Sequence, residues 1–191
     1  ICSDKTGTLT RNEMTVQRLV FADRVVEVSG VGYAPEGGFA VAGVPIEVER
    51  DELVLGLARA AMLCNDAVVR EQNSTWVLEG DPTEGALFAL GLKAGLDPRF
   101  EAESLPRTDV IPFESEHRFM ATLHHDHEGH GWVYLKGAPE VVYGRDGVPL
   151  VLPLDADIDD VRREVGGIVG RYRLDPVDEA YRPIPDSSAG Y

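Results

Sequence analysis

Apolar residues along the chain follow two kinds of spacing, and each predicts a different element. Over 51–63 and 158–169 they recur at intervals of three or four residues, as on one face of a helix. Short β-branched or aromatic runs between turn residues predict strands at 14–21, 24–28, 75–78, 109–113, 119–125 and 131–136. The pattern therefore predicts a mixed domain of helices and strands.

Residues that start and stop helices refine these boundaries. Asp51 stands where a carboxylate can cap the helix that follows it. Pro82 suits the first turn of a second helix over 82–93, and Gly95 follows its end. The strand at 75–78 then turns directly into this helix, and a further short helix is predicted at 138–143.

Turn and loop residues separate the predicted elements. Residues 22–23 form the turn between the first two strands, and 30–43 reads as a surface loop because it holds several glycines, Pro35 and no regular period. The polar segment 126–130 joins 119–125 to 131–136, which predicts an antiparallel pair. Beyond Leu174, the Pro-, Asp- and Ser-rich sequence has little apolar material to pack.

The composition excludes several classes of function. Thirty-three acidic and eighteen basic residues give a formal charge of −15, which disfavours nucleic acid as a partner. A phosphate ligand must then be held by a local patch of basic residues on the protein. No apolar run is long enough for a membrane span, so we expect no direct membrane insertion by this segment. Its two cysteines, Cys2 and Cys64, lie far apart and suggest neither a disulfide framework nor a zinc site.

Residues 4–10 read Asp-Lys-Thr-Gly-Thr-Leu-Thr. An aspartate such as Asp4 can accept a phosphoryl group when a metal ion and nearby donors align it with the terminal phosphate of ATP. Lys5 supplies a cation, Thr6 a hydroxyl, and Gly7 lets the backbone approach phosphate closely. The segment resembles the phosphorylated-aspartate signature of P-type cation-transporting ATPases, which implies that Asp4 is phosphorylated and that Asp4 and Thr6 contribute to an incomplete Mg²⁺ site.

Thr6 also discriminates between two kinds of phosphoryl chemistry. Haloacid-dehalogenase-type phosphatases carry a second aspartate two residues after the nucleophile, where it acts as general acid and base. A threonine at that position cannot do this at neutral pH, so a phosphorylated Asp4 is hydrolysed slowly and can persist as an energised intermediate. This favours a pump over a stand-alone phosphotransferase or phosphatase.

Four later segments resemble the nucleotide-binding domain of the same family, in its calcium- and sodium-pump-like branch. In the family's order they are Cys-Asn-Asp at 64–66, Gly-Asp-Pro-Thr-Glu-Gly-Ala-Leu at 80–87, Pro-Phe at 112–113 in a stretch reaching Met120, and Lys-Gly-Ala-Pro-Glu at 136–140. The resemblance therefore spans residues 1 to about 140.

The resemblance implies roles for three of these residues around adenine. Phe113 presents a ring face for stacking, and Met120 fills the adjoining apolar wall. Glu84 accepts a hydrogen bond from the adenine amino group. A lone phenylalanine beside proline is otherwise ordinary core packing, and Glu84 is also placed to stabilise the positive end of a helix.

Two cations and a glycine complete the implied site. Lys136 lies at the pocket floor and reaches toward the phosphates, and Gly137 leaves room for the base. Arg118 stands where the family usually has a lysine that contacts the phosphate tail. Ser115 replaces a frequent arginine, and Asp175 lies where the family has a phosphate-binding segment, so both weaken the implied affinity for ATP.

All five histidines fall within fourteen residues and raise the alternative of a metal site. They are His117, His124, His125, His127 and His130. Opposite strand faces separate the second from the third, and the last two belong to a predicted turn, so no tetrahedral ligand set is implied. A solvated hairpin is the preferred interpretation.

The resemblance implies an α+β fold, with a twisted, mainly antiparallel sheet flanked by helices. It divides the chain into a phosphorylation-domain stub at 1–15, a nucleotide-binding domain at 16–186 and a flexible tail at 187–191. The implied ligand is ATP with Mg²⁺, and the implied partners are the phosphorylation, actuator and membrane domains of a pump. This places the segment on the cytoplasmic side of an integral membrane protein.

The implied activity of the parent pump is ATP hydrolysis coupled, through the phosphorylated Asp4, to cation transport. The family's Gly-Asp-Gly-x-Asn-Asp motif is absent from this sequence, so we expect the fragment to bind nucleotide without sustained turnover. The alternative is a non-catalytic interaction module with a degenerate nucleotide pocket, for which Ser115 and Asp175 are the supporting residues.

Overall fold

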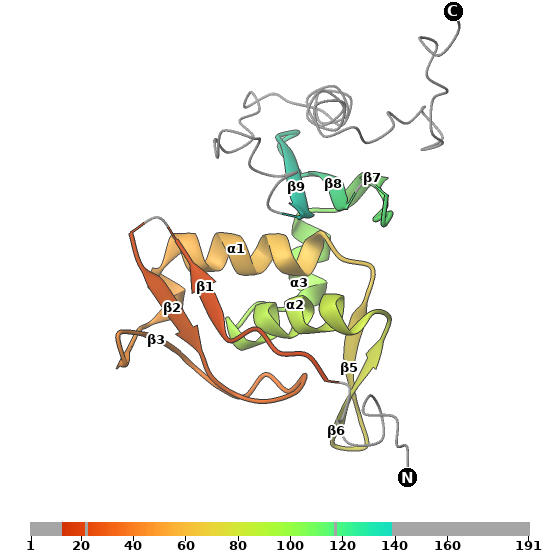
Figure 1. Cartoon of the computed structure of the whole chain (residues 1–191). Coiled ribbons are helices and arrows are strands. Elements are labelled where there is room, and N and C mark those ends of the chain that lie inside the picture. Colours follow the sequence, from red (N-terminus) through yellow and green to blue (C-terminus); the bar gives the residue numbers. More distant parts are fainter. Residues whose placement is uncertain (1–12, 22, 117, 139–191) are drawn as a thin grey trace, which may run out of the picture. The chain divides into compact units, whose positions relative to one another are not determined.

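The structure is a computed structural model that describes residues 13–21, 23–116 and 118–138 (Figure 1). Contacts divide the chain into two units, Ile1–Glu101 and Ala102–Tyr191, and each is described here by itself. The predicted mixed α+β class with antiparallel strands is confirmed, and the described strands pair in three separate sheets. The motif at 4–10, the predicted helix at 158–169, the tail and nearly all of the predicted helix at 138–143 lie outside the described residues.

The first unit begins with a four-stranded antiparallel sheet in the order β1-β2-β3-β4. Its strands are Arg18–Val20, Val25–Val28, Phe39–Val41 and Val44–Pro45. Alternate residues, among them Leu19 and Val26, are buried in the core of this unit. Val20 and Val25 form a cross-strand pair whose side chains stay exposed.

The prediction of a loop throughout 30–43 is wrong, because β3 lies inside it. Three residues are too few to show an alternating pattern among glycines. β3 instead pairs with β2 on one side and β4 on the other, and the turn into β4 uses Ala42 and Gly43 with φ of 49° and 77°. Such a pair of positive φ values matches the twist of a tight hairpin.

Two helices pack side by side in the first unit: α1, Glu52–Leu63, and α2, Pro82–Lys93 (Figure 1). Both match their predictions, and the carboxylate of Asp51 caps α1 by accepting from the Val54 amide at 3.2 Å. A Cβ on Gly91 would lie 2.5 Å from the Met62 Cε, so the glycine permits the close approach of the two helices.

Four shorter elements complete this part of the chain. They are the 3-10 helix η1 at Val48–Arg50, the hairpin of β5 at Val68–Gln72 and β6 at Thr75–Glu79, and α3 at Pro98–Ser104. α3 was not predicted, because it has no apolar face. It is held by its Asp97 cap, which accepts from the Arg99 and Phe100 amides, and by Glu101, which accepts a 2.6 Å hydrogen bond from the Nε of Arg59.

The second unit contains a three-stranded antiparallel sheet of β7, Arg107–Ile111, β8, Phe119–His125, and β9, Gly131–Gly137. β8 lies between the other two and is buried on both faces, including the polar residues Thr122 and His124. The predicted antiparallel pairing of the last two strands is confirmed. None of the helices in the described ranges is long and apolar enough to cross a membrane.

Candidate nucleotide site

The Cys-Asn-Asp and Gly-Asp-Pro-Thr-Glu segments, far apart in sequence, meet in the first unit through Asn65. Its Nδ2 donates to the backbone oxygen of Ala61 near the end of α1, at 3.0 Å, and to that of Glu84 in the first turn of α2, at 2.9 Å. Its Oδ1 accepts from the Ala67 amide at 2.8 Å. One side chain therefore ties the end of α1 to the start of α2.

The start of α2 is fixed by a second side chain, Asp81. Its Oδ1 accepts from the amides of Thr83 at 2.8 Å and Glu84 at 3.3 Å, and Pro82 occupies the first helical position, where no amide is needed. Gly80 precedes the cap with a φ of 126° and packs so closely on Ala67 that an added Cβ would lie 2.8 Å from the Ala67 Cβ. Glu84 is thus held in the first turn, where the helix dipole favours its negative charge.

In the second unit, five predicted site residues gather at one end of the three-stranded sheet. β7 ends at Ile111, which pairs with Ala121, and β8 begins where Phe119 pairs with Gly137 at the end of β9. We call this the Gly137 end of the sheet. It carries five predicted residues, from β8, β9 and the β7–β8 connection: Phe113, Arg118, Met120, Lys136 and Gly137.

Strand register determines which of these residues share a face. Met120 and Lys136 are direct cross-strand partners, so their side chains leave the sheet on the same side. Met120 is fully buried, and Lys136 is half-buried. Phe113 follows β7 and is 54% exposed, so core packing does not account for it. An exposed aromatic ring and a lysine therefore occur at the same end of one sheet.

The close packing of β8 and β9 explains why residue 137 is a glycine, and the sequence did not reveal this packing. A Cβ there would lie 2.7 Å from both the backbone oxygen of Arg118 and the Cβ of Phe119. Arg118 itself has a φ of 58°, and its oxygen accepts from the Ala138 amide at 2.9 Å. The glycine therefore lets β9 close tightly on the beginning of β8, in addition to any role beside a ligand.

Part of the chain matches a known protein family. Residues 54–145 match the family described as P-type ATPase, cytoplasmic domain N. The chain carries a P-type ATPase N domain. The matched range includes the Asn65 junction, the start of α2 and the Gly137 end of the sheet.

Curated relatives of this N domain are pumps several times longer than the chain. A cation-transporting ATPase pma1 from Synechocystis is 45% identical over 150 residues, which make up 76% of this chain and 16% of the relative. A calcium-transporting ATPase from Bacillus subtilis is 33% identical over 145 residues (76% and 16%), and a calcium-transporting ATPase type 2C member 1 from Bos taurus is 43% identical over 146 (74% and 15%). The chain thus spans about a sixth of the length of these relatives.

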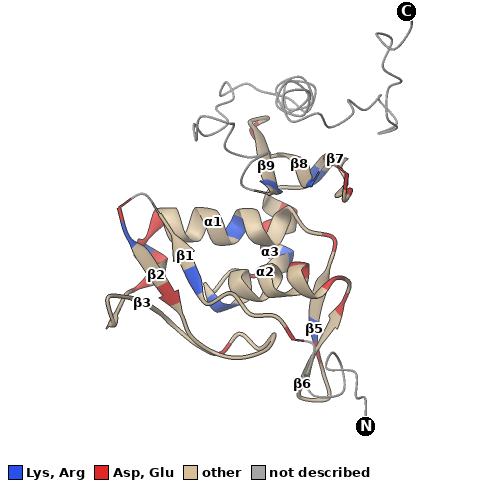
Figure 2. Cartoon of the chain, viewed as in Figure 1, with Lys and Arg blue, Asp and Glu red and all other residues tan. Residues whose placement is uncertain are grey.

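Charge is dispersed over the N domain. Figure 2 shows acidic positions scattered over many elements rather than gathered in one segment. Since the chain carries a net charge of −15, a phosphate ligand needs local cations, and Arg118 and Lys136 supply two at the Gly137 end. Asp4, Lys5 and Thr6, the predicted catalytic residues, lie outside the described residues.

The histidine segment differs from the predicted solvated hairpin at one position. His124 is only 1% exposed, with Nδ1 2.8 Å from the oxygen of Leu105 and Nε2 3.0 Å from the Thr122 hydroxyl. Burial lowers the pKa of His124, the hydrogen bond to Leu105 opposes this, and the nearby Arg107 and His125 lower it further. Its position in the central strand, rather than in the turn, explains the burial.

The rest of the hairpin fits the prediction. His127 and His130 are exposed, and the ring of His130 lies 2.9 Å from the carboxylate of Asp126, which also accepts from two turn amides. Within the part of the chain that the structure describes, no group of three or more histidine, cysteine or acidic side chains could hold a metal ion.

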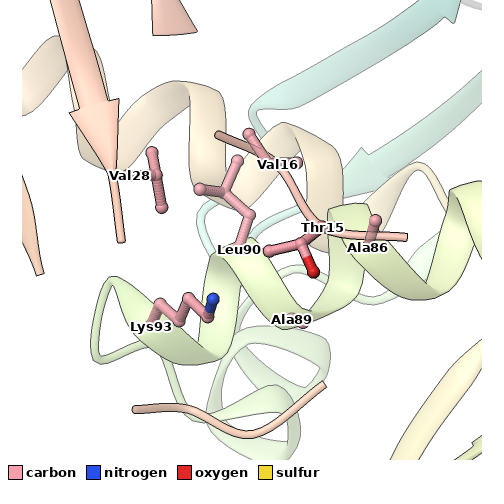
Figure 3. Close-up of a pocket in the computed structure, with 7 residues that line it drawn as sticks. All are labelled: Thr15, Val16, Val28, Ala86, Ala89, Leu90 and Lys93. Carbon is pink, nitrogen blue, oxygen red and sulfur yellow. The ribbon is translucent and has the colours of Figure 1, made fainter. Parts of the chain in front are cut away.

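A small hollow in the first unit is lined by none of the predicted nucleotide residues (Figure 3). It has no room for a water molecule, and its lining is apolar except for Thr15 and Lys93. The ammonium of Lys93 donates to the backbone oxygen of Ser29 at 3.1 Å, and burial lowers its pKa. Because its lysine is already bonded to the backbone and no predicted site residue lines it, we do not assign the nucleotide to this hollow.

Proposed function

We propose that the chain is the ATP-binding part of a P-type ATPase that couples ATP hydrolysis to the transport of a cation across a membrane. The N-domain match and the similarity to a cation-transporting and a calcium-transporting ATPase support this proposal. The observation that carries it is the gathering of Phe113, Arg118, Met120, Lys136 and Gly137 at one end of a single sheet.

Each predicted residue at the Gly137 end has a proposed role in binding ATP. Adenine stacks on the exposed ring of Phe113. The buried Met120 in β8 forms the apolar wall beside the adenine ring. Lys136 and Arg118 attract the phosphates, and Gly137 leaves the end of β9 without a side chain. Glu84, which belongs to the first unit, accepts a hydrogen bond from the adenine amino group.

The catalytic part of the proposal concerns the beginning of the chain. The carboxylate of Asp4 attacks the γ-phosphorus of ATP, the bond to the β-phosphate breaks, and ADP leaves. Lys5 and Thr6 are beside Asp4 in the sequence, and Asp4 and Thr6 would hold Mg²⁺ in part, which would neutralise phosphate charge. Residues 1–15 belong to the phosphorylation domain, 16–186 to a nucleotide-binding domain with a twisted, mainly antiparallel sheet flanked by helices, and 187–191 to a flexible tail. The remaining phosphorylation, actuator and membrane domains supply the other functions of the pump, so this fragment binds ATP without sustained turnover.

Calorimetric titration of the 191-residue chain with ATP tests the proposed site. We expect saturable binding that Phe113→Ala and Lys136→Ala each weaken by about fivefold or more, as loss of a stacking or charged contact implies. Phe100→Ala is the matched control, because Phe100 is an aromatic residue in α3 that is 66% exposed and is not among the predicted site residues. Equal weakening by the control, or unchanged affinity in both site variants, would contradict the proposed site.

A non-catalytic interaction module is the second candidate. It is favoured by Ser115, an exposed residue at a position that is often a cation in the family. This candidate predicts no ATP binding by the wild-type chain at several millimolar, whereas even a millimolar dissociation constant, about −4 kcal/mol, supports the first.

A further inference from the structure

Both peptide groups that flank the Cα of Glu84 are held by side chains. Its amide donates to Asp81 Oδ1, and its backbone oxygen accepts from Asn65 Nδ2. Asp81 lies three residues away and acts as an ordinary helix cap, whereas Asn65 lies nineteen residues earlier and belongs to the segment after α1. The direction in which Glu84 projects therefore depends on a residue outside its own helix.

The amide group of Asn65 can take only one orientation in this network. The Ala67 amide is a donor and must meet Oδ1, while the oxygens of Ala61 and Glu84 are acceptors and must meet Nδ2. Both donors and one acceptor site are thus used. An aspartate has the same shape but would place an oxygen against two carbonyl oxygens.

We infer that Asn65 is a positioning residue for nucleotide recognition, because it holds Glu84 in place to accept from the exocyclic amino group of an adenine ring. Asn65 touches no ligand itself and acts through the backbone of Glu84. This inference rests on the proposed function, and specifically on the proposed role of Glu84.

The test compares two ligands that differ only in that amino group: ATP and purine riboside 5′-triphosphate. We expect the wild-type chain to bind ATP about three- to tenfold more tightly than the analogue, the range set by one hydrogen bond. Asn65→Asp removes most of this preference by weakening ATP binding, while affinity for the analogue changes little. Adding Asn65→Ser to Glu84→Ala causes no further loss of ATP affinity.

Asn73→Asp is the matched control. Asn73 lies in the exposed turn between β5 and β6, with a φ of 52° that asparagine and aspartate both tolerate, so this substitution adds the same negative charge without touching Glu84. It leaves the preference for ATP unchanged. Asn65→Ser keeps one hydroxyl donor on a shorter side chain. If Asn65→Asp does not fold, the preference of Asn65→Ser for ATP over the analogue decides the test.

Four outcomes separate the claims. Loss of the ATP preference in the Asn65 variants, with affinity for the analogue retained, supports the inference. Equal weakening of both ligands, or a fully retained preference, overturns it and assigns Asn65 a structural role only. A preference that persists in Glu84→Ala overturns the role of Glu84 and the inference, but leaves ATP binding in place. Absence of binding to either ligand by the wild-type chain overturns the proposed function as well.

Discussion

The start of α2 and the Gly137 end of the three-stranded sheet hold their polar residues by different means. At the start of α2, two side chains, Asn65 and Asp81, bond to the backbone on either side of Glu84. At the Gly137 end, strand pairing sets Lys136 opposite Met120, and no side-chain clamp is needed to explain that register.

This difference predicts different sensitivities to mutation. A position fixed by side-chain hydrogen bonds is disturbed by changes of polar chemistry, whereas a position fixed by pairing is disturbed by added volume between strands.

The largest effect is expected at Gly137. Gly137→Ala places a Cβ 2.7 Å from the oxygen of Arg118, which is backbone and cannot move aside without opening the ladder. We expect the free energy of unfolding to fall by about 2 kcal/mol, within the range of overpacking effects. Urea denaturation followed by circular dichroism measures this change.

Gly56→Ala is the control for this substitution. Gly56 lies in α1, and an added Cβ would meet nothing within 4 Å. It should raise the free energy of unfolding by up to about 1 kcal/mol through helix propensity. A destabilisation by Gly56→Ala as large as that of Gly137→Ala would show that the sheet end is not specially tight.

An intermediate effect is expected from acidification, through His124. Burial favours its neutral form and holds the pKa in the folded state below the ordinary 6.5. Between the lowered pKa and 6.5 the unfolded chain binds more protons, so stability is full above about pH 6.5 and falls as the pH decreases through this window. One group contributes at most about 1.4 kcal/mol per pH unit.

Denaturation at pH 7.5, 6.5 and 5.5 measures this dependence. His124→Gln should flatten it, and the exposed His127→Gln should not. A pH dependence that is identical in wild type and His124→Gln would contradict the assignment.

The smallest effect on stability is expected at Asp81. Asp81→Ala removes the acceptor for the Thr83 and Glu84 amides and should lower the free energy of unfolding by about 1 kcal/mol, as loss of a helix cap does. Asp81→Asn keeps an acceptor oxygen and should remain within about 0.5 kcal/mol of wild type. Thermal denaturation of the two variants side by side checks this, and equal destabilisation would point to the charge rather than the cap.

Local signals in the sequence were sufficient for several elements. Pro82 and Gly95 mark the ends of α2, and the polar segment between the strands predicted at 119–125 and 131–136 indicated the antiparallel pairing of β8 with β9. β5 was missed because Arg70, Glu71 and Gln72 leave it without alternation, and α3 because its sequence has no apolar face. Such elements depend on pairing or packing partners, β6 for β5 and Arg59 for α3, that their own apolar pattern does not reveal.

The candidate site was predicted in part for the same reason. Motif resemblance named Glu84, Phe113 and Lys136, but the bond between Asn65 and Glu84 arises only when α1 packs against α2. The burial of His124 likewise depends on the strands beside it and not on the histidine-rich composition around it.

The most direct test of the central claim is to map ATP-induced shifts of backbone amides in the ¹⁵N-labelled chain by two-dimensional NMR, with and without Mg²⁺. We expect saturable shifts at the Gly137 end, at Phe113, Arg118 to Met120 and Lys136 to Gly137, and little change in the turn at 126–130. Shifts confined to that turn or to the hollow beside Lys93, or no shifts at several millimolar ATP, would contradict it.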